Sequence, residues 1–210
     1  MARLIGGFIV GKLGNDIYYV WKGKQKVRKY NAKVKNPNTP LQQANRQKLV
    51  MATRLGSRLK QVVRVTYQGS KKESQYNEFV SHVYRSVISG EFPDYVIDYT
   101  ILQVARGNIL APRLMVAEKC DNNLVLSWYA GFNENGRRQH DDRMALLLIN
   151  SAGEINLTYN LATRIDEKAK LQLPENFKSN FHAWAFYTAD IHGFEDNRNN
   201  VSGSVYLGSF

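Results

Sequence analysis

The chain has 210 residues, of which 43% are hydrophobic and 22% are charged, and this composition is typical of a folded protein rather than a disordered, collagen-like or membrane-spanning one. Its formal net charge is +11 at pH 7. The single cysteine, Cys120, excludes an intramolecular disulfide, and no His or Cys residues surround it at the spacing of a zinc site. We therefore expect no metal and no other cofactor.

The charge is distributed unevenly along the chain. Residues 1–72 contain 17 Lys and Arg but one acid, Asp16, whereas residues 73–210 contain 12 Lys and Arg and 17 acids. A basic region of this kind favours an anionic partner such as nucleic acid, acidic lipid or acidic protein. The basic and acidic parts could instead face each other, within one chain or between copies. The sequence leaves both interpretations open.

The first residues resemble a secretory signal only briefly, because Lys12 interrupts the apolar run that begins at Leu4. No stretch approaches the roughly 18–20 apolar residues that a membrane span needs. We therefore expect no membrane span, and a location in the cytoplasm or within a virion-like assembly.

Glycines punctuate two β-rich runs near the N-terminus, residues 17–21 and 27–30. The intervening Lys22-Gly23 suits a tight turn, so the pattern predicts a hairpin or a pair of ribbon strands. An isolated hairpin is marginally stable in water. We therefore expect a helix, a sheet or another subunit to cover Tyr19, Trp21 and their neighbours.

Two amphipathic helices are predicted next. Thr39 is a good N-cap and Pro40 a good first helical residue, so a helix is expected over residues 40–67, although Lys48 falls within its apolar stripe. A second helix is expected over residues 74–89, closed by Gly90. The short polar break between them predicts an αα-hairpin.

After Pro93 the hydrophobic period changes from helical to two. Strands are expected over residues 95–104, 113–119, 123–130, 144–150, 154–160, 168–173, 180–189 and 201–208. Short strands divided by polar turns predict an antiparallel β-sandwich, with Trp128 and Trp184 meeting in its core. The expected fold class is α+β: a β-ribbon and helical hairpin over residues 1–93, and a β-sandwich over residues 94–210.

The strongest candidate for a binding surface is basic and aromatic. Its basic side chains fall on the predicted ribbon and on helix one: Lys22, Lys24, Lys26, Arg28, Lys29, Arg46, Arg54, Arg58 and Arg64. The interleaved aromatic side chains are Tyr18, Tyr19, Trp21 and Tyr30. Basic groups neutralise phosphates and rings stack on bases, so the pattern suits nucleic acid. The same alternation also describes a ribbon with one wet and one buried face.

Catalytic motifs are weak in this chain. Gly6-x4-Gly11-Lys12 imitates a P-loop, but Leu13 stands where Ser or Thr would bind magnesium. His140-Asp141-Asp142 could form a metal or acid–base cluster, yet Asp-rich loops are ordinary turn chemistry. No nucleophile with its base can be placed, so we expect no catalytic residues and no enzymatic activity.

Several segments together resemble one family. They include Trp21-Lys22-Gly23, Asn36-Pro37-Asn38-Thr39-Pro40, Leu124-x-Leu126-x-Trp128 and the closing Val201-Ser202-x-Ser204-x-Tyr206. The chain resembles an uncharacterised family, domain of unknown function 6266, found mainly in Bacteroidota. Residues 36–46 are also similar to stretches of phage and prophage structural proteins. The C-terminal half is similar to a fibronectin type III or immunoglobulin-like sandwich, a frequent binding scaffold.

These observations favour a non-enzymatic structural or interaction protein. The expected role is a component of a phage- or prophage-derived assembly that oligomerises, or binds other structural proteins, through its basic N-terminal module. The alternative is a nucleic-acid-binding protein that uses the basic aromatic ribbon and the arginines of helix one. A salt-dependent affinity would mark the alternative.

Overall fold

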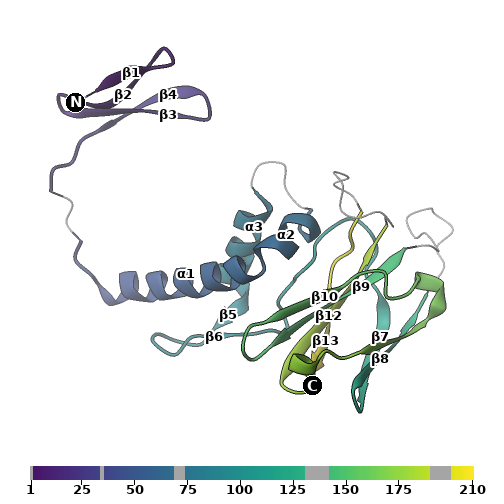
Figure 1. Ribbon diagram of the computed structural model, residues 1–210. Coiled ribbons are helices and arrows are strands. Elements are labelled where there is room, and N and C mark those ends of the chain that lie inside the picture. Colours follow the sequence, from purple (N-terminus) through teal and green to yellow (C-terminus); the bar gives the residue numbers. More distant parts are fainter. Residues whose placement is uncertain (1, 34–35, 69–73, 131–141, 190–199) are drawn as a thin grey trace. The chain divides into compact units, whose positions relative to one another are not determined.

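A computed structural model describes residues 2–33, 36–68, 74–130, 142–189 and 200–210 (Figure 1). The chain forms two compact units, Met1–Pro40 and Leu41–Phe210. The division therefore falls at Pro40 and not at residue 93, where the sequence placed it. The reason is that the helices share a hydrophobic core with the C-terminal strands.

The N-terminal unit is a four-stranded antiparallel sheet in the order β1-β2-β3-β4. Its strands are β1 (Arg3–Ile5), β2 (Phe8–Leu13), β3 (Asp16–Trp21) and β4 (Lys24–Lys29). The structure thus contains the two expected strands and adds two more before them. Lys22 and Gly23 join β3 to β4 with φ angles of 51° and 72°. Two consecutive positive φ angles define the type I′ turn, whose twist matches that of the strands it joins.

The helical part begins at Pro40, the residue expected in the first helical position. Its elements are α1 (Pro40–Arg58), α2 (Lys60–Thr66), α3 (Gln75–His82) and a π-helical turn, η1 (Val83–Val87). Ser74 caps α3, since its hydroxyl accepts a hydrogen bond from the Asn77 backbone N–H at 3.2 Å. No helix in the described part of the chain is long and apolar enough to cross a membrane.

The second helical segment ends earlier than the sequence indicates. Two short strands, β5 (Ile88–Ser89) and β6 (Val96–Ile97), pair with each other directly after η1. Gly90, with φ of 86°, therefore belongs to the β5–β6 connection and does not close the helix. The strand expected over residues 95–104 is limited to β6.

Lys48 of α1 faces this hairpin. Its Nζ lies 4.6 Å from the centre of the Tyr95 ring, and the neighbouring Gln47 Nε2 donates a hydrogen bond to the Pro93 carbonyl at 2.6 Å. The ring attracts the cation through its negative face. A lysine within the apolar stripe of α1 is thereby explained.

The remaining strands form two antiparallel sheets. Their bounds are β7 (Arg113–Cys120), β8 (Asn123–Tyr129), β9 (Arg143–Asn150), β10 (Ile155–Thr158), β11 (Lys168–Gln172), β12 (Phe181–Thr188) and β13 (Val205–Ser209). One sheet has the order β10-β9-β12-β13 and the other the order β11-β8-β7. Two 3-10 turns, η2 (Arg164–Asp166) and η3 (Glu175–Phe177), lie between strands. The expected α+β class with a C-terminal sandwich of antiparallel sheets is confirmed.

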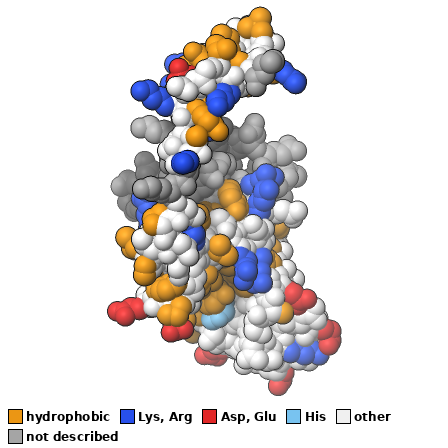
Figure 2. All heavy atoms as spheres, turned by 90° about the vertical axis from the view of Figure 1, so that its left-hand side faces the viewer, with side chains coloured by type: hydrophobic (Ala, Val, Ile, Leu, Met, Phe, Trp, Pro, Cys, Tyr) orange, Lys and Arg blue, Asp and Glu red, His pale blue; other side chains and the backbone are white. Residues whose placement is uncertain are grey.

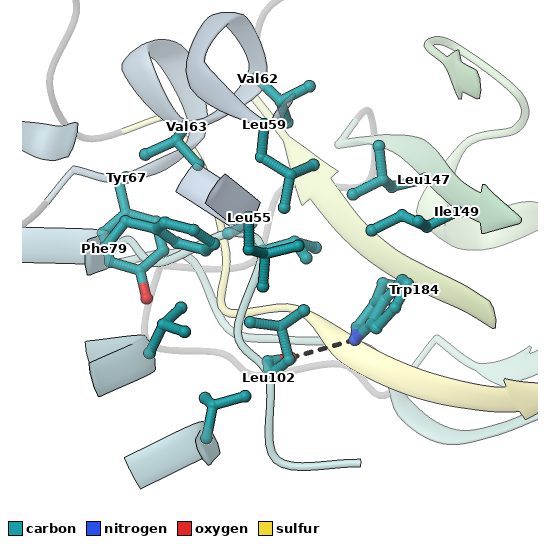
Figure 3. Packing of buried hydrophobic residues seen from close by; sticks show 14 of the residues in the cluster. Leu55, Leu59, Val62, Val63, Tyr67, Phe79, Leu102, Leu147, Ile149 and Trp184 are labelled. Atoms are coloured by element: carbon teal, nitrogen blue, oxygen red, sulfur yellow. Dashed lines mark hydrogen bonds between the residues drawn. The ribbon is translucent and has the colours of Figure 1, made fainter. Parts of the chain in front are cut away.

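The four-stranded sheet is covered on both faces. Along β9, Ala145, Leu147 and Ile149 pack into a cluster with helical residues that include Leu55, Leu59 and Val62 (Figure 3). The alternate β9 residues Met144, Leu146 and Leu148 pack against the three-stranded sheet in a second cluster. The helices and the three-stranded sheet therefore lie on opposite faces of the same central sheet.

This arrangement separates the two C-terminal tryptophans. Trp184 lies on the helical side, and its Nε1 donates to the Leu102 carbonyl at 3.0 Å (Figure 3). Trp128 lies between the sheets, and its Nε1 donates to the Arg164 carbonyl at 2.8 Å. The prediction that the two rings meet in one core was wrong, because β12 presents Trp184 to the face that the helices cover.

Candidate partner surface on the N-terminal sheet

No described residue of the N-terminal unit is buried. Its large hydrophobic side chains are exposed by 38% or more at Leu4, Ile5, Ile9, Leu13, Tyr19, Val20, Trp21, Val27 and Tyr30. Figure 2 shows hydrophobic side chains beside Lys and Arg side chains on this sheet. A folded unit ordinarily buries its large apolar side chains in a core of its own. This unit is therefore a candidate for contact with a partner.

The register of β2, β3 and β4 divides their side chains between two faces. Residues directly opposite each other on antiparallel strands point to the same side, and successive residues point to opposite sides. Trp21 pairs with Lys24, Tyr19 with Lys26 and Ile17 with Arg28, while Lys12 pairs with Ile17. These residues make up one face, which we name the cationic face: Lys12, Ile17, Tyr19, Trp21, Lys24, Lys26 and Arg28.

Two cation–π contacts occur at this face. The Lys12 Nζ lies 3.5 Å from the centre of the Tyr30 ring, which extends the cationic face past the end of β4. The Lys22 Nζ, in the β3–β4 turn, lies 4.9 Å from the centre of the Trp21 ring. Such contacts hold a cation beside the face of an aromatic ring.

The opposite face, which we name the apolar face, differs in chemistry. It carries Leu13, Tyr18, Val20 and Val27, with Gln25 among them and the oppositely charged pair Asp16 and Lys29 at one end. Leu13 and Val27 are each more than half exposed. The sheet is therefore amphipathic, with a hydrophobic side and a basic aromatic side.

The side chain of Gln25 connects β4 to β2. Its Oε1 accepts a hydrogen bond from the Ile9 N–H at 3.0 Å, and its Nε2 donates to the Ile9 carbonyl at 2.9 Å. Pairing between β2 and β3 extends from Leu13 to Gly11. The glutamine amide thus replaces a ladder partner for the backbone of Ile9, and it ties the first hairpin to the second.

The structure brings together only part of the expected basic and aromatic set. Lys24, Lys26 and Arg28 share the cationic face with Tyr19 and Trp21, and Tyr30 joins them through Lys12. Lys22 occupies the turn, whereas Tyr18 and Lys29 lie on the apolar face. The arginines of helix one belong to the other compact unit, on α1 at Arg46, Arg54 and Arg58 and on α2 at Arg64.

Lys12 was not among the expected site residues. Its place follows from the pairing of β2 with β3, in which Lys12 lies opposite Ile17. Alternation within β2 alone does not place it, because the face that Lys12 shares with Ile17 depends on the register between the two strands. The sequence signal for β2 itself lies in Phe8–Leu13, which glycines at positions 7 and 14 flank and Gly11 interrupts.

Only one residue of the His140-Asp141-Asp142 cluster lies within the described part of the chain. His140 and Asp141 lie outside the described residues. Asp142 is buried and forms an ion pair with the buried Arg164, at 2.6 Å between Arg164 Nη2 and Asp142 Oδ2. Among the described residues, no group of three or more His, Cys, Asp or Glu could hold a metal ion. Asp142 therefore serves the packing of the sandwich.

The sequence of this chain matches the model of one protein family over residues 8–208, described as a family of unknown function, DUF6266. The chain belongs to this family. The match runs from β2 into β13, so the DUF6266 region includes three strands of the N-terminal sheet together with the helices and the sandwich strands up to residue 208. No curated protein matches the chain.

Proposed function

We propose that this DUF6266 protein is a non-enzymatic structural protein that associates with copies of itself through the apolar face of its N-terminal sheet, as a subunit of a larger virion-like assembly. The observation that carries the proposal is the absence of any buried residue among the described residues of the N-terminal unit. The resemblance of residues 36–46 to phage structural proteins adds support for the type of assembly.

Exposed apolar side chains are unfavourable in water. Leu13, Val20 and Val27 lie on one face of a sheet whose unit has no buried core among its described residues. Burial of a side chain of this size contributes about 1.5–3 kcal/mol. A partner that covers this face therefore stabilises the folded sheet and binds to it at the same time.

Charge favours a second copy as that partner. The apolar face has one acid and one base, Asp16 and Lys29, which lie opposite each other on β3 and β4. Two copies of this face would meet without an excess of like charge, as an isologous interface requires. Two cationic faces would repel each other, since each carries four basic side chains on the paired residues of β2, β3 and β4.

The test compares two double variants by size-exclusion chromatography with light scattering, at low and high salt. Val20→Thr/Val27→Thr alters the apolar face and keeps β-branched side chains. Tyr19→Thr/Lys26→Thr alters a cross-strand pair on the cationic face of the same two strands. We expect a salt-resistant oligomer for the wild type and for the second variant. For the first variant we expect the dissociation constant of the oligomer to rise at least about tenfold.

Two results would overturn the proposal. A wild-type protein that stays monomeric at high micromolar concentration would point to a different structural protein as the partner. An oligomer that Val20→Thr/Val27→Thr leaves unchanged would place the contact elsewhere on the chain.

A further inference from the structure

We propose that the cationic face of the N-terminal sheet is a binding site for single-stranded nucleic acid. Self-association and this site use opposite faces of the sheet, so the inference does not depend on the proposed assembly role. The site consists of a defined set of side chains on β2, β3 and β4.

Two aromatic rings lie in a row on the cationic face. Tyr19 and Trp21 are alternate residues of β3 and therefore lie side by side along the same face, about 6.6 Å apart by the rise of a strand. This spacing is about twice the 3.4 Å rise of stacked bases in one strand. An extended strand with unstacked bases can thus place successive bases on successive rings. Trp21 is 59% exposed, so a base can reach its ring, where the Lys22 Nζ already lies 4.9 Å from the ring centre.

Basic side chains lie in a row beside these rings. Lys24 and Lys26 lie directly opposite Trp21 and Tyr19, and Arg28 continues the row at the next position on this face. A strand whose bases stack on β3 would bring its phosphates beside this row. Among the paired residues of β2, β3 and β4, the cationic face has no acidic side chain, because Asp16 points to the other side.

The rings distinguish a single strand from a duplex. A row of cations alone would suit the phosphates of either form. Exposed rings contribute stacking energy only where bases are free to leave their neighbours, as in single strands. A duplex keeps its bases stacked on one another, so the rings of Tyr19 and Trp21 would remain without a partner in such a complex.

The test is a fluorescence titration of the full-length protein. Of the three tryptophans, Trp21 is exposed, whereas Trp128 and Trp184 are 5% and 0% exposed. An oligothymidylate of about 20 nucleotides, longer than most single-strand site sizes, should therefore quench the emission of Trp21. The same titration with an oligouridylate and with a duplex of equal length separates DNA from RNA and single from double strands.

Salt dependence measures the number of cations in contact. Four basic residues on the face predict a slope of log affinity against log salt near −3, from about −0.7 per phosphate neutralised on a single strand. The affinity should then fall about 50-fold between 50 and 200 mM salt. A slope near zero would overturn the proposal.

Matched triple variants locate the site. Lys24→Gln/Lys26→Gln/Arg28→Gln removes three charges from the cationic face, and Arg54→Gln/Lys60→Gln/Arg64→Gln removes three exposed charges from α1 and α2. We expect the first variant to lose at least about tenfold in affinity and to show a slope near −0.7, and the second to stay within about twofold of the wild type. Equal losses in both variants would overturn the proposal, because they would show that net charge alone drives binding.

Further variants separate loss of contact from loss of folding. Lys24→Arg/Lys26→Arg keeps the charges and should retain binding, while Trp21→Phe should bind with little change in affinity yet show no quenching. Val20→Thr/Val27→Thr should also bind, since it alters the apolar face only. Tighter binding to the duplex than to either single strand would contradict the stacking argument and overturn the proposal.

Discussion

Arg164 donates two hydrogen bonds to one carboxylate oxygen of Asp142, from Nη2 at 2.6 Å and from Nε at 3.1 Å. Both side chains are buried inside the sandwich. The same Nη2 donates to the Leu110 carbonyl at 3.1 Å, and the guanidinium carbon lies 4.0 Å from the centre of the Tyr187 ring. A single arginine thus connects the start of β9, the turn η2 and β12.

Removal of one partner of this pair should destabilise the protein strongly. Asp142→Ala leaves the guanidinium of Arg164 buried without its counter-charge, and such changes cost about 3–5 kcal/mol. Urea unfolding followed by tryptophan emission measures the loss, because Trp128 donates to the Arg164 carbonyl and reports on the same region.

The exposed pair Lys178–Glu175 provides the control for this prediction. Its side chains are 44% and 85% exposed, so Glu175→Ala should leave the unfolding midpoint unchanged. The double variant Asp142→Leu/Arg164→Met should be more stable than Asp142→Ala, since it removes both charges together. A midpoint for Asp142→Ala equal to that of the wild type would show that water reaches the arginine.

The elements of this fold were largely visible in the sequence. Pro40 after Thr39 placed the start of α1, and the period-two pattern of Leu124, Leu126 and Trp128 placed β8. These features are local, because a cap or an alternation needs only neighbouring residues. The α+β class followed from the change of period after Pro93.

The long-range relationships could not be obtained in the same way. The expected boundary at residue 93 missed the shared core in which Leu55 and Leu59 pack on Leu147 and Trp184. One signal was present: residues 144–149 are apolar without alternation, which is typical of a strand covered on both faces. The cationic face likewise depended on the pairing of β2 with β3, which alternation within one strand does not specify.

The two hydrogen-bonded tryptophans should contribute more to stability than the exposed one. Trp184→Phe removes the donor to the buried Leu102 carbonyl, at a cost of about 1–3 kcal/mol. For a chain of this length the melting temperature should fall by about 2–4 °C for each kcal/mol. Trp21→Phe is the matched control and should leave the melting temperature unchanged, because its ring is exposed. A similar decrease in the melting temperature for both variants would contradict a larger contribution of the buried Trp184 to stability.

Substitution by alanine should reduce stability to different extents at three glycines. A Cβ at Gly107 would lie 2.0 Å from the Val201 carbonyl oxygen, so the backbone of one segment must move, and we expect a loss of about 1–3 kcal/mol. A Cβ at Gly56 of α1 would lie 2.8 Å from Val80 Cγ2, a side-chain atom that can shift, and alanine is the better helix former by about 1 kcal/mol. Gly203 has no heavy atom within 4 Å of the same position and is the control.

Thermal unfolding of the three alanine variants checks this order. The melting temperature should fall most for Gly107→Ala, less for Gly56→Ala and least for Gly203→Ala. A Gly107→Ala protein as stable as the Gly203→Ala protein would mean that the chain around Val201 accommodates the methyl group.

Stability should decrease in two steps as the pH is lowered. Burial holds the pKa of His82 and of His182 below the usual 6.5, although a backbone hydrogen bond at Ile101 partly opposes this for His82. Below pH 6.5 the unfolded chain therefore binds protons that the folded chain resists, and stability is lost as the pH falls toward the lowered values. Above pH 6.5 both states are neutral at these positions and the full stability is present.

The second step arises from carboxylates. Hydrogen bonds from Thr100 to Asp98 and from Thr163 to Asp166 hold both pKa values below the usual 3.8. Their contribution is present above pH 3.8 and is lost as the pH falls through the folded-state values. His82→Gln should flatten the first step of a plot of melting temperature against pH, and Asp98→Asn should flatten the second. A melting temperature that rises as the pH falls below 6.5 would contradict the sign derived for the histidines.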